Sequence, residues 1–102
     1  IYNVEDKAIS AGEKSKIKID SILVNSSTYG IVSKDLSSIS GTDVTITNSA
    51  IFDFMAFQKK MHYGPGFISI NNVKYDNKII IQKKSIIKIN DKEIVSKVFN
   101  PN

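Results

Sequence analysis

The sequence predicts an all-β fold in which short parallel strands wind into a solenoid of about four coils. A motif of eight residues recurs with starts 22, 24 and 24 residues apart, at AISAGEKS (8–15), GIVSKDLS (30–37), FMAFQKKM (54–61) and KIIIQKKS (78–85). Apolar residues repeat every second position in and after each motif, which is the period of a β-strand. Polar residues that favour turns fall at matching positions between these stretches. Repetition with this period is typical of solenoids, in which each coil packs on its neighbours.

Each predicted coil contributes short strands whose inward-facing residues lie two positions apart. The first strand lies within the motif, with inward pairs at Ile9/Ala11, Ile31/Ser33, Met55/Phe57 and Ile79/Ile81. The second strand follows, with pairs at Ile17/Ile19, Ile39/Gly41, Ile68/Ile70 and Ile87/Ile89. A third strand is predicted in the first three coils, with pairs at Ile22/Val24, Val44/Ile46 and Val73/Tyr75.

The predicted corners carry polar residues that hydrogen-bond their own backbone and tolerate left-handed φ angles. Between the second and third strands they are Asp20-Ser21, Thr42-Asp43, Asn71-Asn72 and Asn90-Asp91. The third strands end at Ser26, Asn48 and Asn77. We therefore expect one domain over residues 1–102, with coils at roughly 7–28, 29–51, 52–77 and 78–94 and a C-terminal tail or cap at 95–102.

Stacking of the coils about 4.8 Å apart places equivalent residues in rows. Two inward rows are predicted, Ile9-Ile31-Met55-Ile79 and Ile17-Ile39-Ile68-Ile87. Such rows bury continuous apolar columns, so most of the hydrophobic residues, which make up 41% of the chain, are assigned to the core and not to a ligand pocket.

One predicted corner is longer than its equivalents. Two steps separate Ser37 from Ile39, whereas seven separate Met61 from Ile68. The sequence HYGPG (62–66) is therefore predicted to be a five-residue insertion, in which Gly-Pro-Gly ends the strand. A shortened third corner would bring the chain back into register by Ile79.

The repeat resembles that of the right-handed parallel β-helix (pectin-lyase-like) family from Ala8 to Ile94. The resemblance implies a fold shared by polysaccharide lyases and hydrolases, phage tailspikes, adhesins and purely structural segments. The phrases GIVSKDLSSI and AFQKKMHYGPG are also similar to those of bacterial surface proteins, so a secreted or cell-surface location is expected.

The first corner holds the candidate binding residues. Two polar rows align there, Gly12-Lys34-Gln58-Gln82 and Glu13-Asp35-Lys59-Lys83, beside the inserted loop. The candidates are Lys59, Lys60, His62, Tyr63, Glu13, Asp35, Lys34 and Gln58. Glu13 and Asp35 on neighbouring coils would share a calcium ion or a raised pKa, or Asp35 would pair with Lys59 in a purely structural role. No catalytic and no further metal residue is assigned.

Composition argues against several classes of function. The net charge of +4 comes from Lys alone, and without Arg the chain lacks the planar fork that reads bases and grips phosphate, so no nucleic-acid partner is expected. No apolar run approaches about 18 residues, so no membrane insertion is expected. The family's lyases, by resemblance, use several acidic calcium ligands and a basic residue, of which this corner offers few.

Two functions follow from these observations. The first is a non-catalytic β-helical structural or carbohydrate-binding module of a secreted or surface protein. The second is a terminal fragment of a polysaccharide lyase or hydrolase whose catalytic coils lie elsewhere, so enzyme activity is not expected of this chain alone. The expected partners are carbohydrate and either the rest of a longer chain or end-to-end protein contacts.

Overall fold

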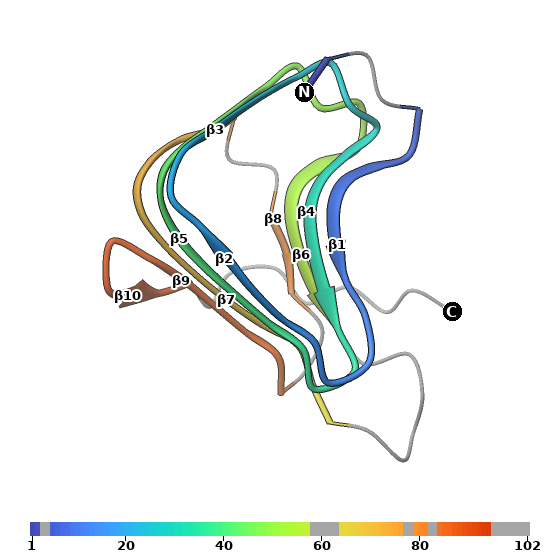
Figure 1. The fold of residues 1–102 in the computed structure, drawn as a ribbon, viewed down its shortest axis with the longest axis vertical. Coiled ribbons are helices and arrows are strands. Elements are labelled where there is room, and N and C mark those ends of the chain that lie inside the picture. The colour runs from blue at the N-terminus through green and yellow to red at the C-terminus, as the bar shows by residue number, and fades with distance from the viewer. Residues whose placement is uncertain (3–4, 58–63, 77–78, 82–83, 95–102) are drawn as a thin grey trace.

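The computed structural model describes residues 1–2, 5–57, 64–76, 79–81 and 84–94, which form a parallel β-solenoid (Figure 1). Its strands are β1 (Lys7–Ala11), β2 (Lys16–Ile19), β3 (Ile22–Asn25), β4 (Tyr29–Lys34), β5 (Ser38–Thr47), β6 (Phe52–Phe57), β7 (Phe67–Lys74), β8 (Ile79–Ile81), β9 (Ile86–Ile89) and β10 (Lys92–Glu93). No helix occurs among these residues, so none of them forms a helix that is long and apolar enough to span a membrane. The predicted all-β solenoid is confirmed.

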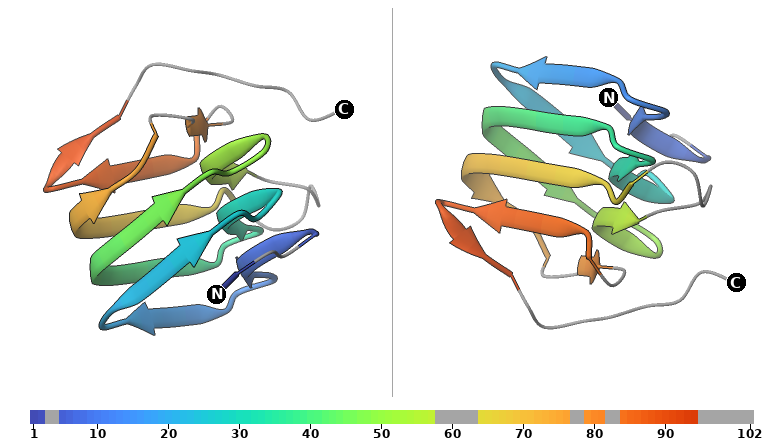
Figure 2. Two further views of the ribbon diagram at one scale, coloured as in Figure 1. Left: turned by 90° about the horizontal axis from the view of Figure 1, so that it is seen from above. Right: turned by 90° about the horizontal axis from the view of Figure 1, so that it is seen from below.

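The strands stack into two sheets that face each other across the interior, as Figure 2 shows from two sides. The first sheet has the order β1-β4-β6-β8, and the second has the order β10-β9-β7-β5-β2 with β3 also paired to β5. β5 and β7 bend at a corner and continue into a third wall, where they extend the ladder that starts at β3. About three turns are complete, and not about four, because the last coil has β8 and β9 but its next strand, β10, turns back.

The pairing register confirms one predicted inward row and corrects the other. Along the second sheet, the row Ile17-Ile39-Ile68-Ile87 is paired as predicted. In the first sheet, Ile31 pairs with Phe54, and Phe54 pairs with Ile79, so the predicted row through Met55 is wrong by one residue. The third corner of the second coil is only one residue longer than that of the first, whereas the predicted row requires two extra residues there. Residues 54 and 55 are both apolar, so the alternation of apolar residues is compatible with either length.

Two apolar clusters pack on opposite faces of the first sheet. The interior cluster runs through the whole solenoid and includes Phe54, which is fully buried and meets Tyr75 edge to face with ring centroids 5.5 Å apart. The second cluster consists of Val32, Phe52, Met55 and Phe57, with Tyr29 packed against it. Tyr29 and Phe52 stack with centroids 4.6 Å apart. Met55 is thus core, as predicted, but in the outer cluster.

The second and third corners use polar residues in the left-handed region, as the turn chemistry predicted, and the first corner also places Leu36 there. Positive φ angles occur at Lys14, Asp35, Leu36 and Lys84 in the first corner, at Asp43, Asn72, Asn90 and Asp91 in the second, and at Ser26 and Asn48 in the third. Side chains link these corners from coil to coil, since the Asn72 amide donates to Asp43 and the Asn48 amide donates to Asn25 Oδ1. The corner ladders therefore hold the coils in register.

The last coil ends in a hairpin because of one additional left-handed residue. Asp43 and Asn72 are single positive-φ residues, and the chain continues past them into the third wall. Asn90 and Asp91 both have positive φ, the requirement of a two-residue type I′ turn, and β10 folds back antiparallel on β9. The Ile94 amide then donates to Ile87 O at 2.8 Å. Residues 92–94 thus cover part of the edge of β9. The predicted tail or cap at 95–102 lies outside the described residues and stays a prediction.

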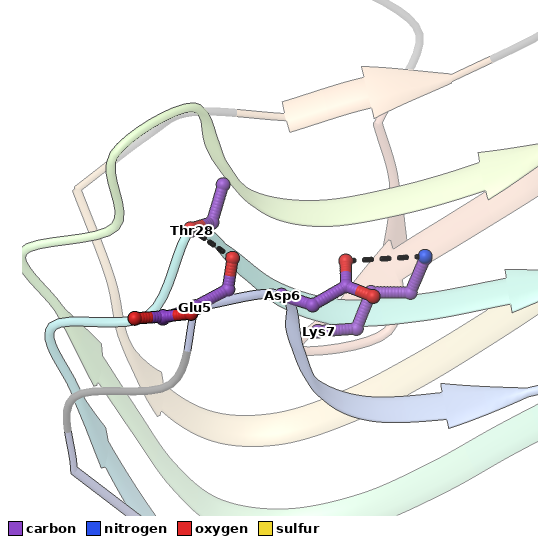
Figure 3. Close-up of polar contacts among 4 residues, drawn as sticks. All are labelled: Glu5, Asp6, Lys7 and Thr28. Carbon is purple, nitrogen blue, oxygen red and sulfur yellow. Dashed lines mark hydrogen bonds and ion pairs between the residues drawn. The ribbon is translucent and has the colours of Figure 1, made fainter.

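The other end of the solenoid is formed by the start of the chain. Ile1 and Tyr2 run parallel to β3, and the Asn25 amide donates to Ile1 O at 2.9 Å. Figure 3 shows the adjoining corner, where Thr28 Oγ1 donates to Glu5 O at 2.7 Å and the Lys7 ammonium lies 3.3 Å from the Asp6 carboxylate. The Thr28–Glu5 bond attaches the segment before β1 to the third corner of the first coil, whereas the Lys7–Asp6 pair is local.

Candidate functional site

The predicted site at the first corner is described in part. Gln58, Lys59, Lys60, His62 and Tyr63 lie outside the described residues. The other predicted site residues have different environments, since Glu13 is exposed, Lys34 is half-buried and Asp35 is 1% exposed.

Neighbouring corners meet through the backbone at this point, because the Lys14 amide donates to Asp35 O at 2.9 Å. Glu13 and Asp35 therefore belong to stacked corners, as predicted. Among the described residues no group of three or more His, Asp or Glu side chains is placed to hold a metal ion. The predicted calcium site stays a prediction.

The polar row at this corner needs the same one-residue correction as the interior row. Lys34 pairs with Phe57, so Gln58 is not its equivalent. Because Ser38 pairs with Phe67, the corner takes four residues from Lys34 to Ser38 but ten from Phe57 to Phe67. The insertion is therefore six residues long, and not five.

The end of the inserted loop is fixed against the preceding coil. The Leu36 amide donates to the carbonyls of Gly64 and Pro65 at 3.0 and 3.2 Å, and the Phe67 amide donates to Ser37 O at 3.1 Å. A Cβ at Gly66 would collide with the Ser33 carbonyl, whose carbon would lie 2.6 Å away. The backbone approach thus explains Gly66, whose φ is not positive.

A buried serine network supports the same corner. Ser37 Oγ accepts the Lys34 amide at 2.9 Å and donates to Ala11 O at 2.9 Å. Ser33 Oγ lies 2.8 Å from Ser37 Oγ and also accepts the Phe67 amide at 3.3 Å. Both serines are fully buried, so these hydroxyls hold three neighbouring segments together and are closed to a substrate.

The sequence analysis missed a second polar surface, the outer face of the sheet formed by β2, β5, β7 and β9. Its side chains alternate with the inward isoleucines and therefore point to solvent. Register defines two outward columns, Lys16-Ser38-Phe67-Ile86 and Lys18-Ser40-Ser69-Lys88. At the next outward position Thr42 pairs with Asn71, and Asp20 and Asn90 directly follow the ends of β2 and β9. The sequence feature that could have predicted this face is Phe67. It comes one position before the inward Ile68, so strand alternation places its aromatic ring on the outer face.

This outer face combines apolar and polar surface. Phe67 and Ile86 are paired and half-buried, so they form an apolar strip beside the inserted loop. Next to the strip, the hydroxyls of Ser40 and Ser69 face solvent between two lysines at the ends of their column. Such a surface can stack an aromatic ring on an apolar ligand face and offer hydroxyl and ammonium donors at its edge.

Strand pairing establishes a parallel β-solenoid of about three turns, and the outward columns follow from its register. No family model, curated protein or solved structure matches the chain.

Proposed function

We propose that this chain is a non-catalytic β-solenoid module of a secreted or cell-surface protein, and that it binds carbohydrate on the outer face of its second sheet. The observation that carries the proposal is the strip of Phe67 and Ile86 beside the hydroxyl column of Ser40 and Ser69. A relationship to the right-handed parallel β-helix (pectin-lyase-like) proteins is part of the proposal, supported by the parallel coils and the corner insertion.

The chemistry of the face favours an extended, acidic polysaccharide. Sugar rings have an apolar face that packs on an aromatic side chain and hydroxyls that need polar partners at its edge. Lys18 and Lys88 are exposed at the two ends of the hydroxyl column, where they would meet carboxylates of the polymer. Asp20 is exposed and directly follows β2, so its acidic side chain would limit how far such a polymer extends toward the second corner.

The solenoid itself supports a structural role alongside binding. Coil-to-coil hydrogen bonds and the continuous interior cluster make a rigid support for an exposed surface. Binding residues on strands are held more firmly than residues on free loops.

The test is calorimetric titration of the chain with pectate and alginate, and with neutral dextran, with and without calcium, while absorbance reports any unsaturated product. We expect binding of an acidic polymer without product. Phe67→Ala and Lys88→Ala are each expected to weaken it about tenfold, since each removes roughly 1.4 kcal/mol of contact. Lys74→Ala removes the same charge from the third wall and is the matched control.

The outcomes separate the functions. Binding that is insensitive to Phe67→Ala and Lys88→Ala would move the site elsewhere and contradict the proposed face. Formation of unsaturated product would instead favour the lyase fragment. An absence of binding to all three polymers would leave a structural module.

A further inference from the structure

The first coil forms an end of the solenoid at which apolar side chains are left partly open. Ile9 and Ile17 are half-buried, whereas their row partners Ile31 and Ile39 are 0% and 1% exposed. At the opposite end Ile87 is 0% exposed. The interior is therefore less well covered at the end formed by the first coil, the blue end in Figure 2.

Exposed hydrophobic residues gather at the same end. Ile1, Tyr2 and Leu23 are 42%, 63% and 45% exposed, and all three belong to the first coil or to the segment paired with it. Exposed apolar side chains concentrated at one end of a molecule are typical of interaction sites.

The backbone of β2 is also available for pairing. Among the described residues, β1 and β2 are the outermost strands of their sheets at this end, whereas β3 is covered by Ile1 and Tyr2. The Ser38 backbone amide donates to Ser15 O, so the backbone groups of residue 15 point toward β5. Backbone groups of successive residues point to alternate sides of a strand, so the amides of Lys16 and Lys18 point away from β5. An added strand would find donors and acceptors there, and Tyr2 beside Asn25 shows that this end accepts a parallel strand.

The charge of β2 indicates which kind of strand would bind it. The outward residues of β2 are Lys16 and Lys18, both exposed, and its inward residues are Ile17 and Ile19. A strand placed on β2 needs apolar side chains above the isoleucines and favours acidic side chains beside the lysines, because opposite charges across a strand pair are attractive. A second copy that approached with its own β2 would place lysines against lysines.

We propose that β2 is a docking edge for a parallel strand of a protein partner in which apolar and acidic residues alternate. Docking of this strand would continue the row Ile17-Ile39-Ile68-Ile87 by one residue and cover the open end of the interior. The lysines would then select the partner and disfavour pairing with a second copy of the chain.

The probe is a blocked peptide of about eight residues that alternates valine and glutamate, compared with its valine and lysine counterpart. Fluorescence anisotropy measures binding, and amide hydrogen exchange measures protection of β2. We expect the glutamate peptide to bind about tenfold more tightly than the lysine peptide, with an advantage that falls at high salt. The amides of Lys16 and Lys18 should become protected.

Two substitutions at one position separate charge from backbone pairing. Lys18→Ala keeps the amide and should weaken glutamate-peptide binding severalfold, whereas Lys18→Pro removes the donor and should abolish it; proline is tolerated where an edge amide faces solvent. Lys74→Ala, in the third wall and away from this edge, should leave peptide binding unchanged. Equal affinity for the two peptides, protection elsewhere than β2, or self-association that the glutamate peptide cannot disrupt would overturn the proposal. If Lys18→Pro fails to fold, the Lys18→Ala result and the exchange pattern still decide.

Discussion

The hydroxyl oxygens of Ser33 and Ser37 lie 2.8 Å apart at the first corner, and neither side chain is exposed to solvent. Ser37 also bonds the backbone of Lys34 and of Ala11, so one hydroxyl serves two coils. Its removal would leave buried backbone groups without partners.

We expect Ser37→Ala to lower the free energy of unfolding by about 1–3 kcal/mol, the cost of an unsatisfied buried polar group. Urea denaturation followed by circular dichroism measures the change. Ser40→Ala, at an exposed strand position, is the control and should have an effect within about 0.5 kcal/mol. Equal stabilities of the two variants would show that the serine network contributes little.

Gly66→Ala should destabilise the corner that anchors the inserted loop. The added methyl would collide with the Ser33 carbonyl, and relief of the collision requires movement of the backbone, at a cost of about 1–3 kcal/mol. At Gly12 the nearest atom to an added Cβ is 4.0 Å away, so Gly12→Ala should be neutral or slightly stabilising. Thermal denaturation of both variants tests this, and a stable Gly66→Ala protein would disprove the close approach.

The hairpin that ends the solenoid should depend on the left-handed conformation of Asp91. Asp91→Val should lower stability by about 1–2 kcal/mol, because a β-branched residue disfavours positive φ. Asp91→Gly creates the preferred Asn-Gly turn and should be neutral or stabilising. Asp20→Val, at an exposed corner residue without positive φ, controls for loss of the charge. Equal effects of the two valine substitutions would argue against a type I′ turn.

Deletion of residues 94–102 should lower the melting temperature or cause aggregation. Ile94 packs against the interior cluster and donates to Ile87 O, so its loss uncovers both apolar surface and part of the edge of β9. Circular dichroism and light scattering measure the two effects. Ile94→Ser in the full chain isolates the contribution of the side chain. An unchanged melting temperature without aggregation would count against a cap.

The inserted loop makes a separate contribution to carbohydrate binding in our interpretation. Combined Tyr63→Ala and Lys59→Ala substitution should reduce binding on a glycan array, because an aromatic ring and an ammonium group are lost together. Tyr2→Ala with Lys74→Ala removes the same two side-chain types away from the loop and is the matched control. If binding survives in the loop variant, the loop is not a recognition element.

The spacing of residues along the chain was enough to predict the fold class and most of the register. A coil can stack on the next only if inward residues meet inward residues, and a slip of one position would expose the whole row. The spacing alone therefore predicted the row Ile17-Ile39-Ile68-Ile87 and the polar corners at Asp43 and Asn72.

The length of the third corner in the second coil was decided only in three dimensions. Phe54 and Met55 are both apolar and both buried, but they face different clusters, and no pattern of hydrophobicity distinguishes the two faces of a sheet that is covered on both sides. The same ambiguity made the loop insertion one residue too short in the prediction.

The end of the solenoid and its outer face also required the tertiary structure. Asn90-Asp91 resembles the earlier corner pairs, and the sequence does not show that both residues adopt positive φ and reverse the chain. Phe67, Ser40 and Lys88 are far apart in the sequence and become one surface only through parallel pairing. Local patterning is set by the alternation of a single strand, whereas a surface is set by which strands become neighbours.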